Sequence, residues 1–379
     1  LLQIQSEMSR LREHVVLWFA LRCALCISER RTIRVVMDPT NFQNMTESWN
    51  PTFVDYLNLQ VGQTMNVTFE LIEMNATYQS MDYRVNNRLV DFYFCSTARC
   101  GCTIARYNAV DLLTKIDYGL DRNTTTTKQG AVFVTASNNS KIQTMKDIRG
   151  ASVISTDLQG LRNGIMQISS LFDQGIYLFN DAKFVATPSR YSPLSSHTAA
   201  RLIAQGAVDV LMTESNDPIL RDMRAALRVF GDLSSGSVLW YQTHTMATPN
   251  WGLLAFPHVP EPLTFAVLSA LHAMPRSHPA AVAGDYAGWT MSVGYDDVVH
   301  ILQDSGIIEL DDTGAGPWCI WDRPSFHPYD LVTCPSDTSK LPEAASTVRC
   351  RDDNVTCPTA VCWCSPCRAG TDTQIYLRE

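Results

Sequence analysis

The chain has 379 residues, of which 45% are hydrophobic and 18% charged, a balance typical of a folded protein with two or three domains. The formal net charge of −8 argues against a nucleic-acid-binding protein, because such proteins normally present a basic face. The sequence contains no uninterrupted apolar run of roughly eighteen residues, so we expect no membrane-spanning helix within it.

Residues 1–31 have the composition of a targeting segment. Two arginines, Arg10 and Arg12, precede the apolar stretch 15–28, which has the length of a signal-peptide core. Arg22 interrupts that stretch, so a buried amphipathic helix is the alternative interpretation.

Hydrophobic patterning predicts strands and helices in turn along the first half of the chain. β-branched and alternating segments indicate strands, and apolar residues at helical spacing indicate helices. We expect helices at 51–59 and 142–148, a short helix ending near 89, and strands at 32–38, 65–73, 90–95, 131–135 and 151–155.

The second half continues the same alternation. Residues 284–289 are expected to form a Gly-rich aromatic turn that pins one element against another, because glycine allows close backbone approach. Strands alternating with helices predict an α/β fold built on mostly parallel sheets. We expect helices at 159–174, 197–206, 261–274 and 296–304, and strands at 183–187, 208–213, 227–230 and 251–257.

The composition changes near residue 314, where hydrophobic periodicity stops and a domain boundary is expected. Seven of the twelve cysteines lie from residue 319 onward, which favours a small disulfide-rich module over residues 314–379. The tight spacing of the last four cysteines also fits a zinc site, the less favoured alternative. The candidate disulfide cysteines are Cys95, Cys100, Cys102, Cys319, Cys334, Cys350, Cys357, Cys362, Cys364 and Cys367.

Six N-x-S/T sequons accompany these cysteines. The combination indicates an oxidising, glycosylating secretory route in a eukaryotic host, and hence an extracellular or cell-surface location. The candidate glycosylation sites are Asn44, Asn66, Asn75, Asn123, Asn138 and Asn354.

Several short segments occur in the order and spacing of a known family. They are Trp49-x-Pro51 before Asp55-Tyr56-Leu57, then Val90-Asp91-Phe92, Lys146-Asp147-Ile148-Arg149-Gly150, Gly206-x-Val208-Asp209-Val210, and Trp251 followed by the stretch 280–289. Through these segments, residues 32–306 resemble the periplasmic phosphonate-binding-protein family. Within it, the sequence is most similar to the sensor domains of tetrathionate-type sensor histidine kinases.

The resemblance implies a bilobal periplasmic-binding-protein type 2 fold, in which two α/β sandwich lobes are joined by two crossovers. Lobe one would contain residues 32–128 and 241–313, and lobe two residues 129–240, followed by the small disulfide-rich C-terminal segment. The family holds its ligand, typically a small oxyanion, between the lobes. Contacts from both lobes would then stabilise a closed state about a hinge.

The stretch 95–102 departs from the family pattern, which has an Asn-Pro-x-x-Tyr-type turn after this strand. One interpretation is a local disulfide that staples a loop. The other is a rebuilt ligand wall, and both can hold together.

Candidate ligand residues follow strand ends and precede helices. Loops at the carboxyl ends of strands line the crevice of open α/β sheets, and helix N-termini there favour anions. Ordinary helix capping is the alternative interpretation, and for Arg99 a solvated surface position. The candidates of this kind are Ser96, Thr97, Arg99, Ser155, Thr156, Ser195, Ser196 and His197.

A second group is expected at the cleft for other reasons. Thr213 and Glu214 follow a buried strand, and a carboxylate there would repel an anion unless an arginine is tied to it. Aromatic and imidazole groups are expected near the mouth of lobe one, although such side chains more often fill cores and rims. They are Trp49, Tyr241, His244 and Trp251.

Motifs for catalysis are absent from the sequence, which has no Gly-x-Ser-x-Gly elbow, no phosphate-binding Walker loop and no His-Glu-x-x-His pair. We therefore expect no enzymatic activity, no cofactor and no metal ion in this region.

The leading hypothesis is an extracellular binding domain for a small, anionic solute. It would be the sensor part of a membrane receptor, attached through sequence outside this chain and compatible with a receptor dimer. An enzyme on the same bilobal fold and a cell-surface interaction scaffold with a degenerate cleft are the alternatives.

Overall fold

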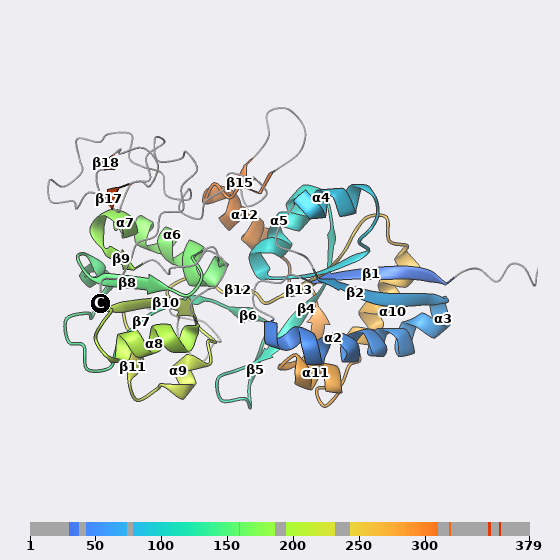
Figure 1. Ribbon diagram of the computed structural model, residues 1–379, viewed down its shortest axis with the longest axis horizontal. Helices are drawn as coiled ribbons and strands as arrows, with labels where there is room; N and C mark the ends of the chain where they lie inside the picture. The colour runs from blue at the N-terminus through green and yellow to red at the C-terminus, as the bar shows by residue number, and fades with distance from the viewer. Residues whose placement is uncertain are drawn as a thin grey trace, which may run out of the picture.

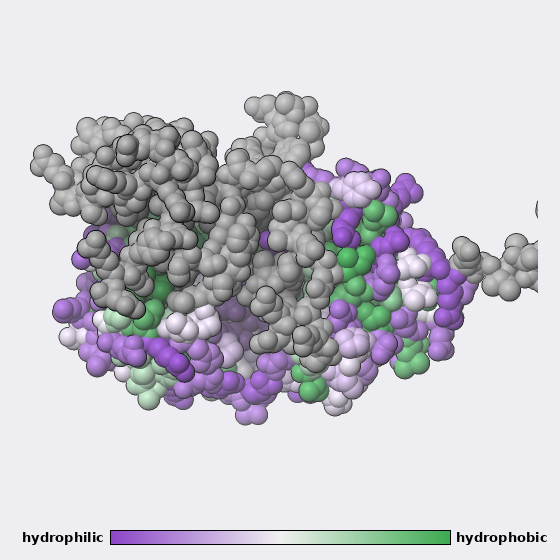
Figure 2. Space-filling model, in the orientation of Figure 1, coloured by the Kyte–Doolittle hydropathy of each residue, from purple (hydrophilic) through white to green (hydrophobic). Residues whose placement is uncertain are grey.

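The computed structural model describes residues 30–37, 43–73, 79–158, 160–185, 195–231 and 243–309, together with 318–319, 348–349 and 356–357. These residues form two lobes side by side, each built on a β-sheet with helices on both faces (Figure 1). Figure 2, in the same orientation, shows hydrophilic residues along the outer edges of both lobes and smaller hydrophobic patches on the visible face of each lobe.

Lobe one is built on a seven-stranded sheet with the order β14-β4-β13-β3-β1-β2, to which β5 adds by pairing with β4. Its strands are β1 (Arg31–Met37), β2 (Val67–Glu73), β3 (Phe92–Cys95), β4 (Val110–Tyr118), β5 (Thr125–Thr126), β13 (Gly252–Ala255) and β14 (Tyr286–Met291). Its helices are α2 (Gln43–Leu57), the π-helical η1 (Asn58–Gly62), α3 (Gln63–Met65), α4 (Gln79–Asn86), α5 (Thr97–Tyr107), α10 (Glu261–His272), α11 (Pro279–Ala283) and α12 (Asp296–Asp304).

Lobe two is built on a five-stranded sheet with the order β11-β7-β10-β8-β9. Its strands are β7 (Ala131–Ala136), β8 (Ser152–Ser155), β9 (Lys183–Val185), β10 (Val210–Glu214) and β11 (Leu227–Val229). Its helices are the 3₁₀ turn η2 (Met145–Ile148), the π-helical η3 (Leu161–Ile165), α6 (Met166–Asp173), α7 (Leu178–Asp181), α8 (Ser196–Ala204) and α9 (Ile219–Asp222).

Two crossovers join the lobes, and they pair with each other. Strand β6 (Lys128–Gln129) leads into lobe two and β12 (Thr248–Pro249) leads back, and the two strands run antiparallel. Two further strand pairs follow lobe one in the chain. They are β15 (Ile308–Glu309) with β16 (Trp318–Cys319), and β17 (Val348–Arg349) with β18 (Thr356–Cys357).

Strict alternation of buried side chains gives each sheet two cores. In β3, Phe92 and Phe94 face the core under α2, α10 and α11, whereas Tyr93 and Cys95 face the core under α5 and α12. The same alternation divides β10 between two cores in lobe two. A strand buried on both faces reads as a continuous apolar run, which is why these strands were predictable from sequence.

The expectation of mostly parallel sheets is wrong, because both sheets are mixed. Strand β1 runs parallel to β2 and β3, but β13 runs antiparallel to both β3 and β4, and β14 runs antiparallel to β4. The chain leaves lobe one after β4 and returns into β13. A departing strand and a returning strand must run in opposite directions when they lie side by side.

The stretch 95–102 is also not a loop, since α5 begins at Thr97 directly after β3. Apolar burial explains this helix, because Ala98, Cys100 and Cys102 all pack into the core. Gly101 allows α12 to approach closely, and a Cβ at this position would lie 2.9 Å from Val298 Cγ1.

The expected aromatic turn at 284–289 is limited to its first two residues, because Tyr286 already begins strand β14. The close approach expected of the glycine is present. A Cβ on Gly284 would lie 2.8 Å from the Trp49 ring and 2.3 Å from the Tyr286 ring. Burial among these groups raises the pKa of the Tyr286 hydroxyl to about 12.

Two disulfides fix helix α5. Cys95 at the end of β3 is bonded to Cys100 in the first turns of α5, and Cys102 is bonded to Cys319 in β16, 217 residues away. The local staple expected from sequence is therefore present, but Cys102 belongs to a second, long-range bond. The cysteines from Cys334 onward lie outside the residues whose side chains are described.

The two bonds should differ in their contribution to stability, because a cross-link restricts the unfolded chain more when it closes a longer loop. We expect Cys102→Ser with Cys319→Ser to lower the free energy of unfolding by about 5 kcal/mol, and Cys95→Ser with Cys100→Ser to lower it by about 2 kcal/mol. Urea unfolding of the oxidised wild type and both double variants measures the difference. Equal losses would contradict the loop-length argument.

Candidate functional site

The candidate site lies where the two crossovers meet both lobes. Residues that follow β3 and β10 contact the backbone of the second crossover and of the end of β4, respectively. The Thr97 hydroxyl donates to the Pro249 carbonyl at 2.9 Å, and Asn216 Nδ2 donates to the Tyr118 carbonyl at 2.7 Å. We call this region the lobe junction and define it by Thr97, Lys115, Asp117, Gln129, Arg162, Glu214, Pro249, Asn250 and Trp251.

Arg162 is the central cation of the lobe junction and is only 7% exposed. Its Nε lies 3.2 Å from Glu214 Oε2, and its Nη1 donates to the Pro249 carbonyl at 3.0 Å. The side chain comes from the π-helical turn η3. A Cβ on Gly164 would lie 2.1 Å from the Leu158 carbonyl, so this turn requires glycine. Arg162 thus joins lobe two to the second crossover.

Lys115 and Asp117 supply a second ion pair from strand β4. Lys115 Nζ lies 2.7 Å from Asp117 Oδ1, and Gln129 Nε2 donates to Asp117 Oδ2 at 3.0 Å. The Lys115 ammonium also lies 5.9 Å from the centre of the Trp251 ring. The lobe junction therefore contains two cations and two carboxylates from three different segments, β4, η3 and β10.

Burial raises the pKa of the Asp117 carboxyl above its ordinary value, and the nearby charge of Glu214 adds to this effect. The Lys115 ammonium, through its charge and its hydrogen bond, and the Arg162 guanidinium oppose it. Titratable groups with shifted pKa values of this kind are frequent at functional sites.

Several buried polar atoms at or near the lobe junction have no hydrogen-bond partner among the described residues. The Gln129 and Asn250 amides each donate through their nitrogen, to Asp117 Oδ2 and to the Thr126 carbonyl respectively, which leaves their oxygens unpartnered. In lobe two the unpartnered atoms are Thr156 Oγ1, Asn163 Oδ1 and Gln167 Oε1. Buried polar groups normally have partners, so these atoms are suited to ordered water or a ligand.

The structure places the predicted residues of lobe one around helix α5. Ser96 is its N-cap residue but its side chain makes no capping bond, Thr97 binds the second crossover, and Arg99 is half-buried in the first turn. Trp251 lies at the lobe junction beside Lys115 and is 9% exposed.

In lobe two, the turn after β8 is internally bonded. The Ser155 hydroxyl donates to the Asn163 carbonyl and accepts from the Asp157 amide, whereas Thr156 is buried without a partner. Glu214 is tied to Arg162, which meets the condition under which its charge would not repel an anion. The Thr213 hydroxyl donates to buried Asp217 at 2.7 Å, whose pKa burial raises.

The residues that begin α8 form a helix cap away from the lobe junction. The Ser195 hydroxyl accepts from the Thr198 amide at 3.2 Å. His197 is 57% exposed and lies 3.5 Å from Asp222, and Ser196 hydrogen-bonds Asp217. The capping interpretation therefore accounts for Ser195.

Two predicted aromatic positions have structural roles. Trp49 is fully buried and stacks on Phe53 with ring centres 4.4 Å apart, so it is not at the mouth of lobe one. Both nitrogens of His244 are bonded within lobe two: Nδ1 accepts from the Phe133 amide, and Nε2 contacts the Phe230 carbonyl. Tyr241 lies outside the described residues.

Sequence reasoning missed Arg162, Lys115 and Asp117. Strand β4 was not predicted, and Arg162 lies within an amphipathic segment where a lone arginine reads as a surface residue. The alternation Leu113, Lys115, Asp117 was the available signal, because it places two opposite charges on one face of a strand.

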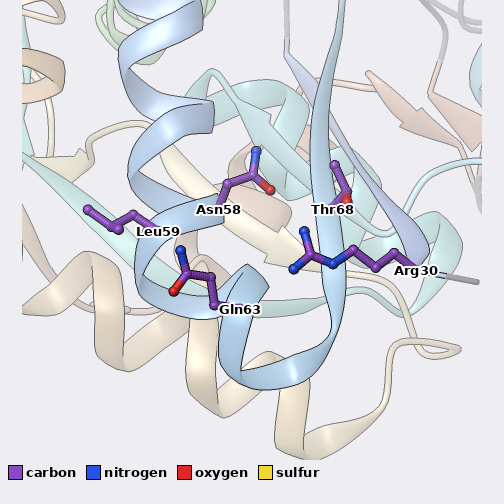
Figure 3. A pocket seen from close by; sticks show the side chains of 5 residues that line it. All are labelled: Arg30, Asn58, Leu59, Gln63 and Thr68. Carbon is purple, nitrogen blue, oxygen red and sulfur yellow. The ribbon is translucent and has the colours of Figure 1, made fainter. Parts of the chain in front are cut away.

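A hollow of about 460 Å³ lies elsewhere in lobe one, near the start of β1 (Figure 3). The Asn58 amide at its wall bonds both backbone groups of Phe69, so this side chain is already committed. We assign no function to this hollow, which is lined by Arg30, Asn58, Leu59, Gln63 and Thr68.

The part of the chain that the structure describes contains neither a cluster of metal ligands nor a membrane-spanning helix. There, no group of three or more His, Cys, Asp or Glu side chains is placed to hold a metal ion. Likewise, none of the described helices is both long and apolar enough to cross a bilayer.

Comparison with known proteins identifies the fold. Residues 36–300 match the family model described as "ABC transporter, phosphonate, periplasmic substrate-binding protein". XAC2383 from Xanthomonas citri bound to ATP is similar in structure, with a TM-score of 0.52, 13% identity, and coverage of 72% of this chain and 97% of that one. PhnD1 from Prochlorococcus marinus with methylphosphonate has a TM-score of 0.50, 14% identity, and coverage of 73% and 98%. No curated protein matches the sequence. The expected bilobal type 2 fold is thereby confirmed.

The raised pKa of Asp117 predicts how stability depends on pH. A carboxyl whose folded pKa is raised contributes stability below its unfolded value, near 3.8, and loses it as pH rises through the folded value. We therefore expect Asp117→Asn to gain stability relative to the wild type as pH rises from about 4 through this window.

Urea unfolding of both proteins at several pH values measures this difference. The Lys115 attraction acts only while Asp117 is ionised, so it is already contained in the folded pKa of Asp117 and adds no separate pH dependence. The test is how the unfolding free energy of Asp117→Asn minus that of the wild type changes with pH. A difference that stays constant or falls as pH rises would contradict the raised pKa of Asp117.

Proposed function

Because the chain belongs to the family of periplasmic phosphonate-binding proteins of ABC transporters, we propose that it binds a small anionic solute between its two lobes. Proteins of this family bind substrates and are not enzymes, and no observation on this chain favours catalysis. The lobes would close on the solute, because a ligand that contacts both lobes stabilises the state in which they approach.

The observation that carries this proposal is the set of buried, unpartnered polar atoms beside paired charges where strands from both lobes end. Thr156 supplies a hydroxyl that can donate to an anion at the carboxyl end of β8. The amide oxygens of Gln129 and Asn250 at the crossovers only accept hydrogen bonds, so they would bond a donor group of the solute or an ordered water. Arg162 supplies a guanidinium already oriented by Glu214. In α/β proteins, ligands bind outside the carboxyl ends of strands.

The proposed ligand class is a small molecule that carries a phosphono, phosphoryl or sulfono group. The structurally similar proteins from Prochlorococcus marinus and Xanthomonas citri were solved with methylphosphonate and ATP, respectively. The net charge of −8 does not oppose an anion at such a site, since local dipoles and the paired Arg162 dominate in a buried environment.

We further propose that the domain is the extracellular sensor part of a membrane receptor, with attachment through sequence outside this chain. Three sequon asparagines, Asn66, Asn123 and Asn138, are exposed, as a glycan requires. Two disulfides fit an oxidising compartment. Asn44, Asn75 and Asn354 have side chains outside the described set.

The lobe boundaries remain part of this proposal. We propose residues 32–128 and 241–313 for lobe one and 129–240 for lobe two. The proposal is supported by the sheets, which draw their strands from residues 31–126 and 252–291 in lobe one and from 131–229 in lobe two. Residues 1–31 as a targeting segment and 314–379 as a disulfide-rich stalk are proposed from sequence alone. In a receptor dimer, such a stalk would transmit the closure of the two lobes to the rest of the receptor.

A thermal-shift screen with methylphosphonate, inorganic phosphate, an alkylsulfonate and ATP tests the proposal on the oxidised protein. A compound present at 100 times its dissociation constant should add about 2.7 kcal/mol of stability and raise the melting midpoint. A well-folded sample that responds to none of them would overturn solute binding in favour of an interaction scaffold.

Once a ligand is found, Thr156→Val should weaken its binding by roughly tenfold while leaving stability unchanged, because the buried hydroxyl has no protein partner to lose. Thr103→Val is the matched control. Its hydroxyl is also buried and unpartnered, but it lies six residues into α5, about 9 Å from the helix start. Isothermal titration measures the dissociation constant of each variant. Equal changes in affinity for Thr156→Val and Thr103→Val would show that Thr156 does not contact the ligand.

A further inference from the structure

The Pro249 carbonyl oxygen is shared by donors from both lobes. The Thr97 hydroxyl of lobe one donates to it at 2.9 Å, and Arg162 Nη1 of lobe two donates to it at 3.0 Å. Pro249 itself belongs to the second crossover. The Pro249 carbonyl oxygen therefore fixes the position of both lobes relative to the second crossover, about which they would hinge.

Apolar packing continues across the same region. Leu161 and Ile165, which flank Arg162 in η3, and Met166, which begins α6, belong to one hydrophobic cluster with Tyr295, Val298 and Leu302 of lobe one. The Tyr295 hydroxyl also donates to the Asn250 carbonyl, next to Pro249. Contacts within the described chain therefore join the two lobes beside the second crossover.

We propose that Arg162 is a latch that keeps the ligand-free lobes closed. It is a positioning residue, because it acts through Pro249 and Glu214. Separating the lobes would remove the Pro249 acceptor from a guanidinium that is 7% exposed. A hydrogen bond from a charged donor shifts such an equilibrium by roughly ten- to a hundredfold. A ligand could therefore enter only after the hydrogen bond between Arg162 and Pro249 has broken.

The test uses the full chain with Arg162→Met and Glu214→Gln together, so that the half-buried carboxylate of Glu214 is not left without its arginine. The matched control is Arg149→Met with Asp181→Asn. Arg149 also bonds one carboxylate, Asp181, and one backbone carbonyl, that of Gly175, but all three lie within lobe two. Circular dichroism melts establish that each variant is folded.

Pulsed electron resonance then measures the distance between spin labels at Tyr83 in α4 and Phe172 in α6. Both side chains are exposed, at 64% and 57%, and they lie in different lobes. Unnatural amino acids carry the labels, so the native cysteines stay intact. The wild type should give one narrow distance, and the latch variant a longer population increased at least tenfold. The control should match the wild type.

Identical distributions in the wild type and a folded latch variant would overturn the proposal, as would a broad, long distribution in the wild type itself. If the double variant does not fold, Arg162→Lys replaces it. Lysine keeps the charge but cannot bond Glu214 and Pro249 with one planar fork, so a smaller shift in the same direction is expected. The labels report on the ligand-free chain, so a failed ligand screen and a failed latch are distinguishable.

Discussion

The arrangement of this protein depends on one carbonyl oxygen, that of Pro249, and on the buried arginine that binds it. Arg162 is paired with Glu214 and anchored to the second crossover. A buried guanidinium is stable only with such partners, because desolvation of an unpaired charge is prohibitive. The need to satisfy this cation therefore fixes how lobe two meets the crossover, and hence the shape of any ligand site between the lobes.

Helix α5 connects that junction to the rest of the chain. Its first residue, Thr97, contacts Pro249, its second turn packs on α12 through Gly101, and its cysteines bond to β3 and to β16. A helix held at so many points moves as one body with lobe one. The disulfide to Cys102 thus ties Cys319 to lobe one, at the helix that reaches the junction.

Charge balance at the junction bears on the kind of ligand it can accept. Lys115 and Arg162 face Asp117 and Glu214, so the site has no large net charge of its own. The unpartnered oxygens of Gln129 and Asn250 add hydrogen-bond acceptors to this balanced set. A ligand would therefore be recognised by directed hydrogen bonds as well as by its charge, which favours selectivity over raw electrostatic attraction.

The sequence by itself determined the α/β class, the buried strands and the family, because continuous apolar runs and the spacing of turn residues are local signals. It also identified Thr97, Thr156, Glu214 and Trp251 as candidates from their positions after strands. Only the tertiary structure decided the antiparallel returns of β13 and β14, the partner of Cys102, the burial of Trp49 and the bonding of His244 within lobe two. Arg162 escaped prediction because its partners Glu214 and Pro249 are distant in the sequence and meet it only in the folded chain. Lys115 and Asp117 pair within one strand, but only the fold places that strand beside Arg162 and the crossovers.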